Sequence, residues 1–249
     1  MASALLHLAM GDLDKLDPDN IEYSSSYRKA YVLGILLPDI AKRKFIDNIE
    51  EFHRYFNGCL EDDILTYDEY IEFSEIHHFN PNRQDTNNPN LRTFVETSYV
   101  DLRKPVWQGV LCHLMGDKAF YYKTYCADFQ RAMQNYINGD KRNGKTWVNS
   151  ETGRVWYEDY DILRKPVEEE YKITEKLEKI ISIELTKELQ EKFNIKYSVE
   201  KTETEYMNWN NIKKYINKSH LLLKYIDNGE IEKILTFFDG EDIDKIFEG

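Results

Sequence analysis

Cysteine is scarce in this chain of 249 residues, and no two cysteines have the CxxC spacing of a thiolate metal site. The three that occur, Cys59, Cys112 and Cys126, are odd in number and scattered. Neither a disulfide framework nor a cysteine-based zinc site is therefore expected. A chain of this length can bury a core large enough to be stable without cross-links, so we expect a reducing compartment.

Long apolar runs are also missing, because no segment approaches the roughly 20 apolar residues that span a bilayer. The N-terminal residues show no basic stretch followed by an apolar core, which argues against a secretory signal. We therefore expect a cytoplasmic protein that is not an integral membrane protein.

Positive charge is in deficit, since 33 Lys and Arg stand against 45 Asp and Glu, for a formal net charge of −12. Proteins that bind polyanions normally use clustered Lys and Arg. No basic stripe interleaved with stacking aromatics occurs, and the tyrosines are dispersed among acidic residues. The sequence therefore predicts no extended nucleic-acid surface, although a bound metal ion can still attract a small anionic substrate.

Glycine and proline are few, with 11 and 6 residues, and apolar residues recur at three- and four-residue spacing among Glu and Lys. This pattern predicts a mainly α fold. We expect a helix through SALLHLAM, an acidic loop at 11–20, and a helix that starts near Ser24 and ends at Pro38. The run from Pro105 predicts two helices, or one helix kinked near Gly116.

Further segments complete the expected architecture. Helices are expected at 43–56 and 66–75, followed by an Asn- and Pro-rich loop at 77–90. KTWVNSETGRVWY has aromatic and β-branched residues on both sides of Ser-Glu-Thr-Gly, which is typical of a short β-hairpin. EEEYKITEKLEKIISIELTKELQEKF predicts a charged amphipathic helix.

The composition shifts after residue 165, where Lys- and Glu-rich surfaces alternate with Ile, Leu and Phe. We therefore expect a metal-binding, catalytic-like helical domain at residues 1–165. Residues 166–249 are expected to form a helical C-terminal cap or interaction region.

His113 and Asp117 in VLCHLMGD are the first candidates for a metal site. In the expected helix their i,i+4 spacing places both side chains on one face, one turn apart. An isolated pair with this spacing is more often a local hydrogen bond or salt bridge. Here the surrounding residues are mostly apolar, and a carboxylate in apolar surroundings needs a cation or strong polar partners.

Other polar residues have a similar setting: His7 in LLHLAM, Asp39 in LLPDI, and His77–His78 before Phe79. Taken singly, they are explained as a core histidine, a helix cap and an exposed loop pair. Imidazole and carboxylate groups together suit Zn²⁺, with Mn²⁺ or another divalent ion as alternatives, and need no thiolate. Together these residues favour a metal site.

The stretches LHLAM, LLPDI, HHFNPN and GVLCHLMGD, in this order, resemble motifs of the zinc-dependent phospholipase C family. That family shares its fold with single-strand-specific zinc nucleases. The resemblance covers residues 1–165, and GVLCHLMGD is its most specific part. It implies a multi-helix bundle of this type, here with a β-hairpin insertion and a helical C-terminal extension.

The resemblance also implies a set of ligands. His7 would serve a neighbouring ion. His77 would either be exposed or contact the ligands without binding the ion itself. The expected ligands of the first zinc ion are His78, His113, Asp117 and Asp39.

The sequence departs from the family pattern in the ligands of the further ions. The family uses another histidine soon after the HxxxD aspartate and a later HxxxE pair. Here Lys123 lies in that neighbourhood, and no histidine occurs between His113 and His220. The secreted enzymes also use the amine of an N-terminal tryptophan, whereas this chain begins with Met1. One or two ions are therefore expected instead of three.

The resemblance implies a phosphoesterase in which the ion activates a water and polarises a phosphoryl oxygen. Asp39 would be either a ligand or the general base. Lys123, Tyr160 and Asp161 are candidates for substrate contact, although surface exposure of the lysine and core packing of the aromatics are the simpler explanations. The expected substrate is a phosphate-ester small molecule or a lipid head group.

Two alternatives remain beside this interpretation. A phosphohydrolase of the HD-domain type requires an adjacent His-Asp dipeptide, and none is present. A non-catalytic helical binding or scaffold protein with a degenerate or structural metal site stays open, with its C-terminal helices contacting a protein partner. The acidic residues Asp12, Asp14 and Asp17 are explained by a solvated loop.

Overall fold

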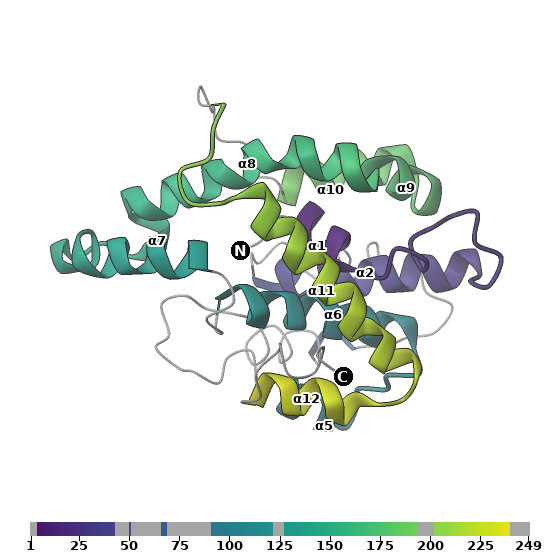
Figure 1. The fold of residues 1–249 in the computed structure, drawn as a ribbon. Coiled ribbons are helices and arrows are strands. Elements are labelled where there is room, and N and C mark those ends of the chain that lie inside the picture. Colours follow the sequence, from purple (N-terminus) through teal and green to yellow (C-terminus); the bar gives the residue numbers. More distant parts are fainter. Residues whose placement is uncertain are drawn as a thin grey trace.

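The computed structural model describes residues 4–42, 50, 66–68, 91–121, 127–193 and 202–239. Within these ranges the regular structure consists of α-helices and short 3₁₀ turns, with no β-strand (Figure 1). The expected mainly α class is therefore confirmed. The helices expected at 43–56 and 66–75 fall largely outside the described residues, and the loop at 77–90 falls outside them entirely.

The elements of the described residues are, in chain order, α1 (Ala4–Met10), α2 (Ser25–Lys42), α5 (Leu91–Glu96), α6 (Pro105–Tyr121), α7 (Ala127–Asn138), the 3₁₀ turns η2 (Lys141–Asn143) and η3 (Trp147–Asn149), α8 (Glu151–Tyr171), α9 (Ile173–Ile180), α10 (Ile183–Phe193), α11 (Trp209–Asp227) and α12 (Ile231–Asp239). The run from Pro105 thus forms two helices, one of the two expected outcomes, and Pro105 is the first residue of α6.

The backbones of α2 and α6 touch at two glycines. A Cβ on Gly34 would lie 2.0 Å from the carbonyl oxygen of Val106, and a Cβ on Gly109 would lie 2.3 Å from that of Tyr31. Both separations are far below van der Waals contact, so no larger residue fits at this crossing. The two glycines therefore determine how closely the helices approach.

Helix α2 does not end at Pro38, so that prediction is wrong. Pro38 lies inside α2, which continues to Lys42. An internal proline lacks the N–H that would bond the carbonyl of Gly34 and crowds that carbonyl. Residues 30–39 are all buried, and their packing retains the helix despite this penalty. Asp39 consequently lies inside the helix instead of at its exit.

The predicted β-hairpin is also wrong, because this segment forms η3 followed by the start of α8. The Ser150 hydroxyl accepts a hydrogen bond from the backbone N–H of Gly153 at 2.8 Å and donates one to the Trp147 carbonyl at 2.7 Å. Ser150 is therefore a helix N-cap. A Cβ on Gly153 would lie 2.0 Å from the Trp147 carbonyl oxygen, so this glycine permits a close contact and does not mark a turn.

The single helix expected over 168–193 is divided into the end of α8, α9 and α10. The breaks occur at Lys172, with φ of 54°, and Ser182, with φ of 111°. At Lys172 the apolar residues on both sides, Tyr171 and Ile173, are buried, whereas at Ser182 only the preceding Ile181 is buried and Ile183 is exposed. Neither break occurs at a glycine, so the sequence contains no local signal for it.

Helix α1 lies at the centre of this arrangement, in contact with α2, α6, α8, α9 and α11. Figure 1 shows α11 crossing over α1 and α6. Helix α8 runs through the boundary expected at residue 165, and the helices after it share the core of the earlier ones. A separate functional role for residues 166–249 stays a prediction.

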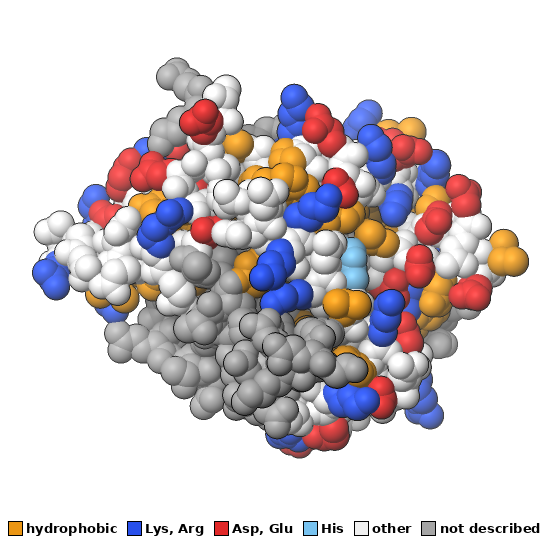
Figure 2. Space-filling model, viewed as in Figure 1, with side chains coloured by type: hydrophobic (Ala, Val, Ile, Leu, Met, Phe, Trp, Pro, Cys, Tyr) orange, Lys and Arg blue, Asp and Glu red, His pale blue; other side chains and the backbone are white. Residues whose placement is uncertain are grey.

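On the face that Figure 2 displays, acidic and basic side chains of the described residues are interspersed, without an extended basic area. Among the described residues, no helix is both long and apolar enough to cross a membrane.

The α2–α6 crossing makes a testable prediction about stability. Gly109→Ala would push a methyl group against the Tyr31 carbonyl and force the helices apart, at a cost of about 2 kcal/mol in the free energy of unfolding. Urea denaturation followed by circular dichroism measures this change. Gly139→Ala is the control, because Gly139 is exposed and its Cβ would lie 3.2 Å from the Asn135 carbonyl oxygen. Equal stability of the two variants would contradict the constraint.

Candidate metal centre

Helices α1 and α6 bring together three side chains of the kind that bind metals. His7 comes from α1, and His113 and Asp117 come from adjacent turns of α6. One possible ligand atom of each lies within 4.8 Å of those of the other two. All three side chains are only 1% exposed. The fold thus joins residues that are more than a hundred positions apart in the sequence.

The distances within this cluster suit ligands of a metal ion better than a hydrogen-bonded triad. His7 Nε2 lies 3.4 Å from Asp117 Oδ1, and His113 Nε2 lies 3.5 Å from Asp117 Oδ2. A charge-assisted N–H···O bond is shorter, about 2.7–2.9 Å. Two ligands bound at about 2.0–2.1 Å to one tetrahedral zinc ion lie about 3.3 Å apart. The observed spacing is close to this second value.

The orientation of the His113 ring is determined by α2. His113 Nδ1 donates a hydrogen bond to the carbonyl oxygen of Ile35 at 2.6 Å, which leaves the Nε2 lone pair on the side of Asp117. Metal-binding histidines usually donate their second ring N–H to a carbonyl or carboxylate in this way. The rings of His7 and His113 stack, with centroids 3.7 Å apart and planes 14° from parallel.

The cluster contains buried polar atoms that the described residues do not satisfy. Neither ring nitrogen of His7 and neither carboxylate oxygen of Asp117 has a hydrogen-bond partner among these residues. An unsatisfied polar atom in an apolar interior destabilises the fold by about 1–3 kcal/mol, and more if it is charged. A divalent cation bound by His7 Nε2 and the Asp117 carboxylate would satisfy three of these four atoms, so the cluster fits a metal ion, while His7 Nδ1 would need a partner of another kind.

The electrostatics of the cluster favour the ligating forms of Asp117 and His7, and favour a protonated His113 that an ion would have to deprotonate. Burial raises the pKa of the Asp117 carboxyl, but the two adjacent histidines outweigh it and hold that pKa well below its usual range. Burial lowers the pKa of His7, and the nearby His113 lowers it further. For His113, burial is outweighed by the Asp117 carboxylate, so its pKa is raised. The site therefore offers an ionised carboxylate and a neutral His7 imidazole, the forms that bind metals.

Asp39 lies beside this cluster but outside its closest set. Its side chain is buried in α2, with 3% exposed, and its charge partly offsets the lowering of the His7 pKa and adds to the raising of the His113 pKa. It is not among the residues whose ligand atoms all lie within 4.8 Å of one another. Asp39 is close enough to influence the histidines. Both roles expected for it, metal ligand and general base, therefore remain open.

Of the other predicted site residues, only Tyr160 and Asp161 are among the described residues. His77, His78 and Lys123 fall outside the described residues. Tyr160 is buried in α8, where its ring meets the Trp156 ring edge-on at 5.8 Å, the core role named above as the simpler explanation. Asp161 is partly buried on the same helix. Substrate contacts by these residues stay predictions.

The directions of the two Asp117 carboxylate oxygens bear on the number of ions that the cluster can bind. Its Oδ1 is directed to His7 and its Oδ2 to His113. This geometry suits two ions bridged by the carboxylate, whereas one ion shared by all three residues would also require the nearly parallel rings of His7 and His113 to tilt until their lone pairs converge. The expectation that His7 serves a neighbouring ion therefore stays a prediction.

Two supporting features were missed in the sequence. One is the Ile35 carbonyl that orients His113, for which the sequence contains no signal, because every residue has a carbonyl. The other is Gly116, where a Cβ would lie 3.3 Å from His7 Nδ1. Glycine is unfavourable inside a helix, and where it occurs another group often packs closely against it. Gly116 in the predicted helix was therefore a sequence signal for close packing at this position.

Comparison with known proteins found no matching family model, no similar curated protein and no similar solved structure. Function is therefore inferred from the geometry and chemistry of the cluster together with the sequence motifs.

The cluster predicts that a divalent ion stabilises the protein. Adding Zn²⁺ to metal-stripped protein at about a hundred times its Kd raises the free energy of unfolding by about 2.7 kcal/mol. Asp117→Asn removes the carboxylate charge and abolishes this gain. Thermal unfolding with and without Zn²⁺, together with elemental analysis, measures both effects.

Asp14→Asn is the matched control, since Asp14 is an exposed carboxylate of the acidic loop, and it keeps the full stabilisation. An equal gain in Asp117→Asn would contradict the site. The ion count of His7→Ala then distinguishes the two arrangements, because a bridged pair loses one of two ions and a shared ion is lost altogether.

Proposed function

We propose that this protein is a metal-dependent hydrolase of phosphate esters, with a divalent ion held by His7, His113 and Asp117. The observation that carries the proposal is the convergence of these buried side chains at a spacing suited to coordination, with the polar atoms of His7 and Asp117 otherwise unsatisfied. Two imidazoles and a carboxylate suit zinc, and Mn²⁺ is the main alternative.

The reaction class comes from the sequence motifs. Their order resembles that of the zinc-dependent phospholipase C family, which adds His78 as a further ligand and a phosphate ester as substrate. A zinc ion held by these residues would supply Lewis-acid chemistry and a water activated near neutral pH.

The protein's own residues supply orientation and proton transfer. The Ile35 carbonyl holds the His113 ring so that Nε2 points into the cluster. The Asp117 carboxylate contributes negative charge between the two imidazoles, which favours a cation there. Asp39 is a buried carboxylate beside the histidines, and it is our candidate to accept the proton of the attacking water.

A second candidate function is a non-catalytic binding or scaffold protein with a structural ion. The observation in its favour is that His7, His113 and Asp117 are each only 1% exposed, since structural zinc sites are closed to solvent. The ion would then tie α1 to α6, and the C-terminal helices would contact a protein partner.

Hydrolysis of a bis-aryl phosphodiester in the presence of Zn²⁺ or Mn²⁺ tests the first function against the second. His113→Ala is expected to lower kcat/KM at least about a hundredfold, equivalent to about 2.7 kcal/mol of transition-state stabilisation. Asp14→Asn is expected to keep the activity. Phospholipid vesicles beside the soluble ester show whether a lipid head group is the preferred source of phosphate. A metal-loaded wild type that hydrolyses neither substrate would overturn the hydrolase and leave the structural ion.

Asp39→Asn separates proton transfer from metal binding. If Asp39 is the general base, this variant keeps its full ion content while kcat falls by about 10²–10³, the range usual for loss of a positioned base. Elemental analysis and steady-state kinetics on the same sample measure the two quantities. A parallel loss of ion and activity would instead identify Asp39 as a ligand.

A further inference from the structure

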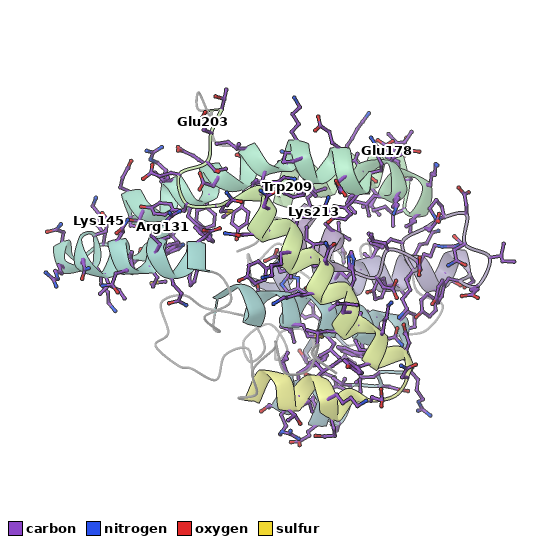
Figure 3. The ribbon with its side chains drawn as sticks, in the orientation of Figure 1. Arg131, Lys145, Glu178, Glu203, Trp209 and Lys213 are labelled. Carbon is purple, nitrogen blue, oxygen red and sulfur yellow. The ribbon has the colours of Figure 1, made fainter. Side chains whose placement is uncertain are left out.

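Helix α11 runs across both helices that carry the candidate ligands, packing against α1 and α6. Figure 3 shows Trp209 and Lys213 where α11 begins near α8, and Lys213 forms an ion pair with Glu170 of α8 at 2.7 Å. We infer that α11 is a positioning helix for the metal centre, in which His220 and Asp227 hold the His7 helix against α6. This inference rests on the proposed metal binding by His7, His113 and Asp117.

The first contact is at the C-terminal end of α1. His220 Nε2 donates a hydrogen bond to the carbonyl oxygen of Ala9 at 2.8 Å, two residues after His7. The last carbonyls of a helix have no partner within the helix and need one from elsewhere. The next carbonyl, that of Met10, accepts from Cys112 Sγ of α6 at 3.6 Å. The end of α1 is thus capped from α11 on one side and from α6 on the other.

The second contact passes through a buried lysine. Lys15, in the loop after α1, donates from Nζ to Asp227 Oδ1 of α11 at 2.5 Å and to Gln108 Oε1 of α6 at 3.1 Å. The Lys15 side chain is 3% exposed, and a buried ammonium group is stable only with such partners. Lys15 therefore connects the end of the α1 segment to α6 and α11 at one point.

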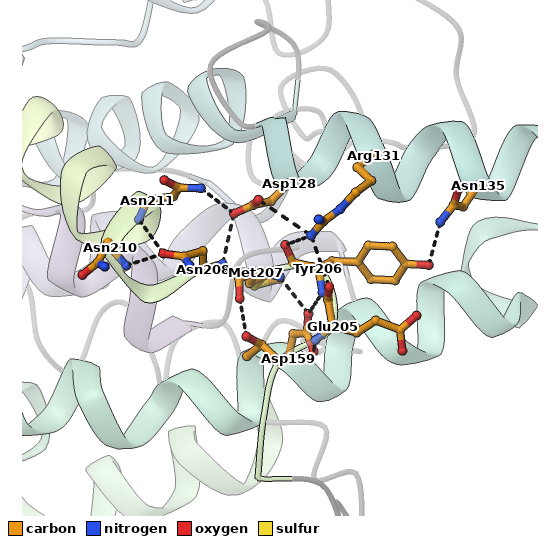
Figure 4. Close-up of polar contacts among 11 residues, drawn as sticks. Asp128, Arg131, Asn135, Asp159, Glu205, Tyr206, Met207, Asn208, Asn210 and Asn211 are labelled. Carbon is orange, nitrogen blue, oxygen red and sulfur yellow. Dashed lines mark hydrogen bonds and ion pairs between the residues drawn. The ribbon is translucent and has the colours of Figure 1, made fainter.

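The placement of α11 is itself determined by two carboxylates at its N-terminal end (Figure 4). Asp159 of α8 accepts hydrogen bonds from the backbone N–H groups of residues 205–207, at 2.9, 2.6 and 2.9 Å. Asp128 of α7 accepts one from the backbone N–H of Asn208 at 3.0 Å. The N-terminal end of α11 is thereby attached to α7 and α8, so the helix has a fixed position over α1.

Helix α1 depends on such contacts because it has only seven residues. Isolated helices shorter than about 12 residues are marginal in water. The position of His7 relative to Asp117 is therefore decided by the elements around α1, among which α11 supplies the contacts of His220 and Asp227. Loss of these contacts leaves His113 and Asp117 together on α6 but releases His7 from them.

The experiment compares Zn²⁺ affinity and the visible absorption of the Co²⁺-substituted full-length protein. His220→Leu removes the donor to Ala9 and is expected to weaken Zn²⁺ binding about tenfold, the lower end of the effect of losing a supporting contact. The Co²⁺ spectrum, which reports coordination, changes in parallel. His220→Gln retains an N–H donor of similar reach and is expected to restore both properties.

Two more variants keep the result interpretable. Ile234→Ala creates a cavity in α12, which packs against α5 and α11, and it should lower stability without changing Zn²⁺ affinity or the Co²⁺ spectrum. Asp227→Ala removes the second contact and is expected to weaken Zn²⁺ binding several-fold, which gives an answer if His220→Leu does not fold.

The outcomes distinguish this inference from the proposed function. A wild type that binds Zn²⁺, with His220→Leu and Asp227→Ala binding it equally well, would overturn the positioning role and leave the metal site. Weakening in Ile234→Ala as strong as in His220→Leu would also overturn it, since general destabilisation would then explain the effect. A wild type that binds neither Zn²⁺ nor Co²⁺ would overturn the metal site and, with it, the inference.

Discussion

The backbone contact between α2 and α6 at Gly34 and Gly109 is the constraint on which the candidate site depends. Because these helices touch without intervening side chains, the Ile35 carbonyl comes within hydrogen-bond distance of His113, one turn after Gly109. That hydrogen bond determines which ring nitrogen of His113 is left for an ion. The orientation of His113 therefore depends on Gly34 and Gly109, two residues without a side chain.

The stability of the fold and the occupation of the site are linked through burial. His7 Nε2 and the Asp117 carboxylate oxygens destabilise the interior unless a cation or another partner satisfies them. Binding of an ion by the folded protein alone would therefore stabilise it. Helix α11 contacts α1 and bonds the Ala9 carbonyl through His220, so under our inference the last long helix of the described residues is part of the same linkage.

The sequence predicted the helical class and the start of α6 at Pro105, because periodicity and first-turn prolines are local signals. It failed where packing outweighed a local signal. Pro38 was interpreted as a stop, but the buried residues around it retain the helix. The Ser-Glu-Thr-Gly segment was interpreted as a hairpin turn, but Ser150 caps α8 and Gly153 allows the Trp147 carbonyl to approach. The residue types alone did not distinguish a helix stop from a continuing helix at Pro38, or a hairpin turn from a helix start at Ser150.

What the sequence by itself determined is the pairing of His113 with Asp117, since residues four apart in a helix share a face whatever surrounds them. The convergence of His7 with that pair was decided by the tertiary structure, as was the position of Asp39 beside it. The contact of His220 with the end of α1 likewise joins residues 211 positions apart. Helical periodicity acts over a few residues, whereas the meeting of ligands depends on helix crossings, which close packing of the whole core sets.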